Sequence, residues 1–283
     1  MPDRGLRYPS GVLDLRAGER WFDAWRRPPV PALAELVEHY WRVRWDVSGR
    51  EPYVQQTLSN ASVHLCVEPG NSRIQGVVTG RFTRLMEGRG RVFGVKFRPA
   101  GFRPFLGSSV AALADRTLPV SAVFGDAGAA YVERVVGLGE DALLAEAANA
   151  FLQERLPPPD PMVAVVNRIV ALIVAERDVT RVDHVVQRVG VRKRTVQRLF
   201  HEYVGVSPKW VIRRYRLHEA AQRLAELETS LADLALDLGY SDQAHFVRDF
   251  KAVVGRPPAR YRQTAGEAVP DAGTVRTRLP GPD

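Results

Sequence analysis

Two stretches in the C-terminal half decide the fold, because each repeats the other. They read "RTVQRLFHEYVGVSPKWVIRRYR" over residues 194–216 and "SDQAHFVRDFKAVVGRPPARYR" over residues 241–262. Both contain the pattern R-x-F-x-x-x-V-G-x-x-P, which starts at Arg198 in the first copy and at Arg248 in the second. The duplication predicts two copies of one structural unit.

Each copy has the pattern of two helices joined by a short turn. In the first copy, apolar residues recur at intervals of three and four over 182–189 and again over 196–203, with a Val-Gly pair between them. The second copy repeats this arrangement over 231–238 and 246–254. Thr180 and Ser230 are the expected N-caps of the two leading helices. The pattern is that of a helix-turn-helix, whose second helix can enter the major groove of DNA.

The faces opposite the apolar stripes carry side chains suited to reading bases. Arginine can pair with both major-groove acceptors of guanine, glutamine pairs with adenine, and small apolar side chains contact the thymine methyl group. The second copy exposes two small apolar residues, a choice that suits contact with thymine better than contact with water. The predicted DNA-contacting residues are Lys193, Arg194, Gln197, Arg198, Gln243, Ala244, Val247 and Arg248.

The charge distribution supports a polyanionic partner. The chain has 283 residues, a formal net charge of +8 and a pI near 10.0. Between Arg181 and Arg216 there are ten Lys and Arg residues against two Asp and Glu, so this window alone carries the surplus of the whole chain. A basic helix surface without a partner has the same composition, so the charge is suggestive only together with the duplicated units.

A long helix is expected between the two units. The segment "SPKWVIRRYRLHEAAQRLAE" over 207–226 begins with a Ser-Pro cap and predicts a helix of about 19 residues, or roughly 28 Å. Such a rod can hold two recognition helices about one DNA turn apart, near 34 Å. We expect Arg213, Arg214 and Arg216 on its solvated surface, with at most one or two of them touching phosphate.

Over residues 161–264 the chain resembles the AraC/XylS family of bacterial transcriptional regulators. The most specific part is "LALDLGYSDQAHFVRDFKAVVGRPPARYR" over 234–262. The resemblance implies base or backbone contacts by all of the residues given above except Lys193. It also implies double-stranded DNA as a partner, and RNA polymerase as a further one. One position departs from the family pattern, since Arg192 stands where a Ser cap is common.

The first hundred residues have the alternation of β-structure. Apolar and polar residues alternate over 41–47, 63–67 and 93–97, which predicts a β-barrel or β-sandwich. The stretches "HYWRVRWDV" over 39–47 and "GVKFRPAGFRPFLG" over 94–107 resemble a cupin-like N-terminal domain found in one subgroup of these regulators. That resemblance implies effector sensing or dimerisation.

The predicted architecture is therefore an α+β multidomain chain with four segments. These are a β-rich effector or assembly domain (1–110), a helical connector with a Pro-rich linker (111–160), an all-α double helix-turn-helix domain (161–266) and a flexible tail (267–283). The prolines of 157–161 mark the main boundary, so a fragment starting there is expected to fold alone. The apolar stripe of the helix over 140–156 either pairs two chains into a homodimer or packs on its own β-domain.

Aromatic and basic residues of the β-domain suit a pocket for an apolar or anionic small molecule, although core packing explains the aromatics equally well. The candidate effector-binding residues are His39, Trp41, Trp45, His64 and Phe97. Neither an apolar run of about 18 residues nor a secretory signal occurs, so we expect no membrane partner and a cytoplasmic location.

No nucleophile or metal-binding motif is found, so neither enzymatic activity nor a cofactor is expected. Two rival classes remain open at this point. One is a regulator that accepts methyl groups from damaged DNA, for which the single cysteine, Cys66, is the candidate acceptor. The other is a cupin-type metal enzyme fused to the DNA-binding domain. Cys66 lies in an apolar strand, which disfavours a reactive thiolate, and the six histidines are scattered.

Overall fold

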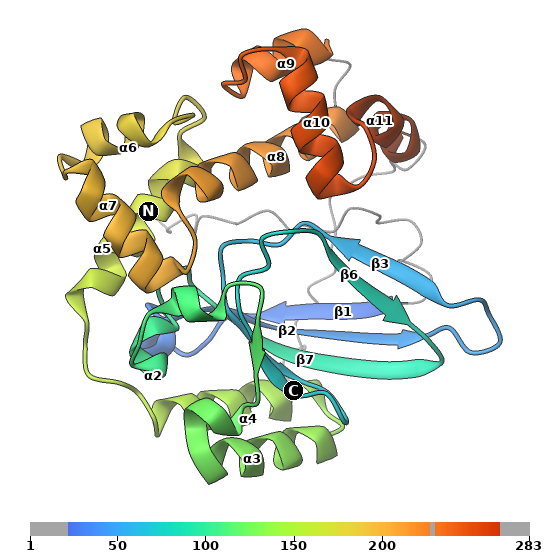
Figure 1. Cartoon of the computed structure of the whole chain (residues 1–283). Helices are drawn as coiled ribbons and strands as arrows, with labels where there is room; N and C mark the ends of the chain where they lie inside the picture. The colour runs from blue at the N-terminus through green and yellow to red at the C-terminus, as the bar shows by residue number, and fades with distance from the viewer. Residues whose placement is uncertain (1–21, 227–229, 267–283) are drawn as a thin grey trace, which may run out of the picture.

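The computed structural model describes residues 22–226 and 230–266, drawn in colour in Figure 1. Its N-terminal half contains a six-stranded antiparallel sheet and a separate two-stranded ribbon. The sheet has the order β1 (Phe22–Arg27), β2 (Val37–Asp46), β7 (Arg89–Phe97), β4 (His64–Val67), β5 (Arg73–Gln75) and β8 (Thr117–Leu118). The ribbon consists of β3 (Tyr53–Thr57) and β6 (Phe82–Met86). The prediction of a β-rich N-terminal half is confirmed.

The strand register separates the sheet into an apolar face, which belongs to the main core, and a second face, called the polar face, which carries His64 and Lys96 as well as the smaller apolar core around Trp45. Tyr40 on β2 lies opposite Val95 on β7, which lies opposite Leu65 on β4, so these three share a face. The next position along sets Trp41 opposite Gly94, on the other face. An irregularity between Val37 and His39 shifts the register at the start of β2. Met86 of the ribbon packs against the second face, and Figure 1 shows β3 and β6 lying over the sheet there.

Two helices, α3 (Ser121–Gly137) and α4 (Asp141–Gln153), cover the apolar face (Figure 1). The Tyr40 hydroxyl donates a 2.6 Å hydrogen bond to Asn149 on α4, and the Arg42 guanidinium pairs with Asp141 at its start. The stripe predicted for this helix, Leu144, Ala147 and Phe151, is buried in the same core. Of the two alternatives for that stripe, the structure shows packing on the chain's own β-domain. Strand β8 also lies in the segment expected to be a connector.

The C-terminal half is helical, as predicted. Its elements are α5 (Pro161–Ala175), α6 (Val182–Val189), α7 (Lys193–Leu199), the π-helical turn η3 (Phe200–Val204), α8 (Pro208–Glu226), α9 (Leu231–Asp237), α10 (Gln243–Val254) and α11 (Pro258–Gly266). Ser230 caps α9 through its hydroxyl, as expected. The expectation for Thr180 was wrong, because the N-cap of α6 is Arg181 and no side chain accepts a hydrogen bond there.

The helical half has two cores, which differ in their relation to the β-domain. The core of α5 to α7 is continuous with that of the sheet and α3–α4. A second core joins the C-terminal half of α8 to α9, α10 and α11, and it also contains Leu58 of the β-domain. Remaining short turns are η1 (Pro31–Leu33), α2 (Arg103–Leu106) and η2 (Val110–Leu113). Within the described ranges, no helix is both long enough and apolar enough to cross a membrane. The proposed tail, 267–283, lies outside the described residues.

Candidate functional site

The first helix-turn-helix consists of α6 and α7. Gly190 ends α6 in the left-handed region, with φ of 65°, which a residue with a side chain rarely adopts. Val196 and Leu199 on α7 are buried against the unit, so the helix turns its opposite face outward. Lys193, Arg194, Gln197 and Arg198 are all exposed on that face. Arg192 is the N-cap of α7 without a capping hydrogen bond, which matches its departure from the usual Ser.

Polar side chains on this outward face are free to bind a partner. In the described ranges the side chains of Arg194, Gln197 and Arg198 make no hydrogen bond or ion pair. Lys193 is held by Asp183 on α6, with 2.9 Å between Nζ and Oδ1. Three long polar side chains with unused donors on one exposed helix face are suited to hydrogen-bonding base edges.

The second unit, α9 and α10, has the same construction with better-defined capping. The Asp242 carboxylate accepts a 2.7 Å hydrogen bond from the His245 amide and starts α10 at Gln243. Phe246 and Phe250 are fully buried, and α10 turns its other side outward. Gln243, Ala244 and Arg248 are exposed, while Val247 is half-buried against the unit's own core. The predicted contact residues of this unit therefore lie on one face, with Val247 at its edge.

Helix α8 joins the two units over Pro208–Glu226, a length of 19 residues, as predicted. The Ser207 hydroxyl accepts a hydrogen bond from the Trp210 amide (3.2 Å) at its start. The expectation that its arginines are solvated holds for Arg213, which pairs with Asp249 at 2.5 Å, and was wrong for Arg214 and Arg216, which are buried. Arg216 donates to the carbonyls of Ile173 and Glu176 at the end of α5, where helix carbonyls lack partners.

The polar face of the sheet carries four of the five predicted effector residues but brings only His39, Trp41 and His64 together, because Trp45 lies six residues from His39 along β2 and packs with Met86 and Val92. His39, Trp41 and Trp45 alternate along β2, and His64 on β4 accepts a 3.2 Å hydrogen bond from Trp41 Nε1. Burial lowers the pKa of His64 to about 3, so the ring is neutral at pH 7. Phe97 lies on the opposite face of β7, in contact with Phe102 and Phe105, and is not part of this cluster.

Two charged residues that sequence reasoning missed complete this cluster. Lys96 is 4% exposed and its Nζ lies 2.9 Å from Glu38 Oε1, while His39 Nδ1 lies 3.3 Å from the same oxygen. Burial would raise the pKa of Glu38, but the hydrogen bonds from His39 and Lys96 and the charge of Lys96 outweigh it and lower that pKa. Glu38 Oε2 is buried and accepts no hydrogen bond from any described group. The sequence around Glu38 and around Lys96 alternates as in any strand, so the Glu38–Lys96 pair can be found only from the register of β2 against β7.

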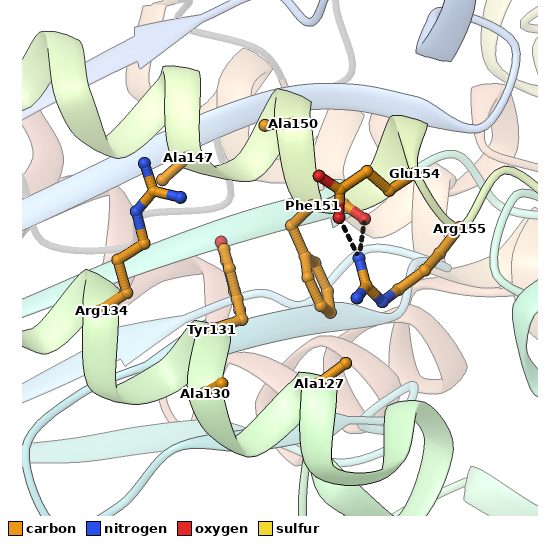
Figure 2. A pocket seen from close by; sticks show the side chains of 9 residues that line it. All are labelled: Ala127, Ala130, Tyr131, Arg134, Ala147, Ala150, Phe151, Glu154 and Arg155. Carbon is orange, nitrogen blue, oxygen red and sulfur yellow. Dashed lines mark hydrogen bonds and ion pairs between the residues drawn. The ribbon is translucent and has the colours of Figure 1, made fainter.

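A groove of about 370 Å³ lies between α3 and α4, on the far side of the sheet. Figure 2 shows its walls, with Tyr131 and Arg134 on α3 and Phe151 on α4, and with Arg155 just beyond the end of α4. The Tyr131 and Phe151 rings stack on each other with centroids 4.1 Å apart, and Arg155 covers the Phe151 ring. Because each ring already uses a face for the other, the groove offers a ligand little aromatic surface.

Cys66 is buried on the polar face of the sheet, and burial raises its pKa to about 11. A thiol with that pKa is almost entirely protonated at neutral pH, and the thiolate is the nucleophilic form. Within the described ranges, no group of three or more His, Cys, Asp or Glu side chains is placed to hold a metal ion.

Comparison with known proteins places the helical half in a family. A family model described as "Helix-turn-helix domain" matches residues 185–264. PqrA from Proteus vulgaris, described as a probable transcription factor, is 36% identical over 83 residues, covering 29% of this chain and 68% of PqrA. The chain belongs to the AraC-type family of helix-turn-helix transcriptional regulators. The transcriptional activator AarP from Providencia stuartii is 36% identical over 80 residues, which are 28% of this AraC-type chain and 59% of AarP.

The N-terminal half of this AraC-type chain matches a second family model, "Domain of unknown function (DUF6597)", over residues 26–119. Among solved structures, a regulator with an AraC-type DNA-binding domain from Chromobacterium violaceum is 26% identical and covers 37% of this chain and 94% of its own, with a TM-score of 0.34. ToxT from Vibrio cholerae is 12% identical and covers 86% of this chain and 97% of its own, with a TM-score of 0.37.

Proposed function

We propose that this AraC-type protein regulates transcription by binding a specific DNA sequence with α7 and α10. The observation that carries the proposal is the pair of recognition helices whose outward faces hold long donor side chains without intramolecular partners among the described residues. Helix α8 connects the two units that contain these helices. Its 19 residues span roughly 28 Å, which is close to the ~34 Å of one DNA turn. One chain can therefore place its two helices in successive major-groove segments.

The residues divide into base-reading and backbone-holding roles. Arg194 and Arg198 can donate to O6 and N7 of guanine, and Gln197 to adenine. In the second unit, Ala244 and the exposed edge of Val247 suit thymine methyl groups. Gln243 lies in the first turn of α10, the part of a recognition helix that reaches base edges, and Arg248 follows one turn later. Lys193, tied to Asp183, is better placed to hold phosphate than to read a base.

Selection of bound sequences from a random DNA pool by the full chain would test this function. If Arg198 reads a base, Arg198→Ala should weaken binding to the selected site by about 1–3 kcal/mol and remove the preference at one position. Arg134→Ala, on the exposed surface of α3, is the matched control and should leave binding unchanged. Equal weakening on all sequences would make Arg198 a phosphate contact, and failure of the full chain to enrich any sequence would refute the proposed function.

We further propose that the N-terminal domain controls DNA binding through a small anionic effector or through pairing of two chains. The effector site would be the cluster of Glu38, His39, His64 and Lys96 beside Trp41. Its support is the buried Lys96 ammonium, a charge that costs stability to bury and that an anion can bind. Lys96→Met should abolish a thermal shift caused by small carboxylates or phosphates. If no anion shifts the melting temperature and sedimentation shows a dimer, pairing is the supported role.

Other parts of the function are proposed on family grounds alone. The AraC-type relatives are named as transcription factors and activators, so we propose RNA polymerase as a partner and the cytoplasm as the location. No enzymatic step is part of this proposal. A protonated Cys66 disfavours the methyl-accepting alternative.

A further inference from the structure

One face of α8 is docked on the N-terminal domain by three side chains spaced four residues apart. Trp210 Nε1 donates to the Thr79 carbonyl (3.4 Å), Arg214 Nη2 donates to the carbonyls of Thr79 and Gly80, and His218 Nε2 lies 3.4 Å from the carbonyl of Ser59. Residues at i, i+4 and i+8 share one side of a helix, so this stripe runs along two turns of α8. The acceptors are all main-chain oxygens of two loops in the β-domain.

Arg214 is the centre of this contact, and burying its charge reduces stability more than burying an apolar side chain would. It is 2% exposed, its guanidinium lies 4.6 Å from the centre of the Trp210 ring, and Nη1 is buried with no hydrogen-bond partner among the described residues. Burial lowers its pKa to about 10, so it stays charged at pH 7. An apolar side chain would fill this space at less cost, but only a directional donor fixes where α8 sits along the loops.

The loop that receives Arg214 is itself held in place. Asp115 accepts hydrogen bonds from the Thr79 amide (2.7 Å) and the Thr79 hydroxyl (2.5 Å), and its own amide donates to the Val77 carbonyl (2.9 Å). Asp115 has φ of 56°, a left-handed conformation uncommon for residues other than glycine. The Ser59 hydroxyl ties the second loop to the Val78 carbonyl (2.6 Å). Both loops that carry the acceptor carbonyls are therefore held in place by hydrogen bonds within the β-domain.

The N-terminal domain also contacts both helix-turn-helix units beyond α8. On the first unit, Arg103 pairs with Glu202 at 2.9 Å, and the Ser109 hydroxyl donates to the His201 carbonyl (3.1 Å). On the second unit, Leu58 is 1% exposed within the core of α8 to α11. Arg81 also lies close to Gly255, where an added Cβ would come within 2.4 Å of its guanidinium.

We propose that these contacts form a clamp that fixes the position of one recognition helix relative to the other. The clamp consists of Trp210, Arg214 and His218 on α8, the loops 58–59 and 79–81, Asp115, and the Arg103–Glu202 pair at the first unit. Arg214 is its positioning residue, and its role is to restrict the separation between the two DNA segments that one chain can read. The restriction on DNA rests on the proposed DNA-binding function, whereas the clamp itself does not.

The clamp can be tested without DNA by measuring distances between nitroxide labels. Labels attached at Arg192→Cys on the first unit and Lys251→Cys on the second sit on exposed positions, and buried Cys66 is protected from labelling. The full chain should give one narrow distance distribution. Arg214→Met, which removes the charge without leaving an unpaired donor, and Asp115→Asn, which tolerates the left-handed backbone, should each widen it at least about twofold.

Two further variants provide an independent disruption of the contact and a control. Arg103→Gln breaks a half-exposed ion pair of the same contact region and should widen the distribution even if Arg214→Met fails to fold. Arg89→Gln breaks the exposed Arg89–Asp46 pair far from the clamp and should leave it unchanged. Unchanged widths in Asp115→Asn, Arg103→Gln and any folded Arg214 variant would overturn the proposal.

DNA of altered spacing reports the functional consequence. One base pair inserted between the two contacted segments shifts them by ~3.4 Å and rotates them by ~35°. The wild-type chain should lose at least about tenfold in affinity, whereas Asp115→Asn should lose less than about threefold. Identical spacing profiles would refute the role of the clamp in DNA reading. If the wild-type chain selects no sequence at all, the proposed function fails while the label distances still decide whether the clamp exists.

Discussion

His218, the third donor of the clamp, should make the protein sensitive to acid. Burial lowers its pKa from 6.5 to about 3, helped by the positive charges of Arg214 and Lys96 and opposed by the hydrogen bond to the Ser59 carbonyl. A neutral ring whose Nε2 donates to that carbonyl fits this environment. A protonated ring would add a second charge beside a buried guanidinium.

The size of the effect follows from the two pKa values. Because the folded-state pKa is lower, the unfolded chain binds more protons between pH 6.5 and 3, so stability is fully present above pH 6.5 and is lost as the pH falls through this window. With about 1.4 kcal/mol per pH unit, the contribution lost at pH 4.5 is roughly 3 kcal/mol.

Urea unfolding at pH 7.5 and pH 4.5 measures this loss. His218→Gln keeps a donor for the Ser59 carbonyl but does not titrate, so the wild type should lose roughly 3 kcal/mol more stability than this variant between the two pH values. Effects of carboxylates and of His64 are common to both proteins and cancel in the difference. His245→Gln, on the exposed face of α10, is the control and should follow the wild type. Equal losses in wild type and His218→Gln would refute the buried neutral imidazole.

Three other predictions concern the two cores and the charged surface. Leu58→Ala should reduce the free energy of unfolding by about 2–5 kcal/mol and lower amide protection in α9 and α10, and a loss below about 1 kcal/mol would contradict its place in that core. Cys66 should react with a disulfide reagent far more slowly in the native than in the urea-unfolded chain at pH 8, and equal rates would contradict its burial and raised pKa. Arg192→Gln should reduce the slope of log K against log salt by ~0.9 if Arg192 contacts phosphate, whereas Arg134→Gln should not change it.

Local sequence patterns predicted much of the fold because they depend on near neighbours. The alternation along β2, the Ser-Pro start of α8 and the Ser230 cap are all decided within a few residues. The predictions that were wrong or missing concern features that are decided by packing and pairing between distant segments. Thr180 has the right side chain for a cap, but the chain starts α6 one residue later, and β8 is only two residues long and exists through its pairing with β5.

The same distinction separates the two candidate sites. The recognition faces of α7 and α10 could be located because a helix turns every third or fourth residue to one side, and eight predicted contact residues follow that rule. On the sheet, the alternation placed Trp41 and Trp45 on one face of β2, as the register has them. It could not tell which residues of β7 face them. The register sets Lys96 against His39 and His64, so Phe97, one position further, points away.

The basic window between Arg181 and Arg216 shows why composition alone could not assign these charges. Arg214 and Arg216 are buried and bind main-chain carbonyls. Arg188, Lys193 and Arg213 are held in ion pairs by acidic residues. The five remaining cations are exposed and make no hydrogen bond or ion pair in the described ranges: Arg181, Arg192, Arg194, Arg198 and Lys209.

Half of the cations in this window thus remain free for a polyanion, and three of these five lie on α7 or its cap. The buried arginines serve a different purpose, because a guanidinium enclosed by the protein cannot reach a DNA phosphate although it keeps its charge. It joins α8 to the β-domain and to α5 instead. A regulator whose connecting helix is tied to its N-terminal domain by directional hydrogen bonds can pass a change in that domain to both recognition helices, since any shift of the acceptor loops moves the helix that carries them.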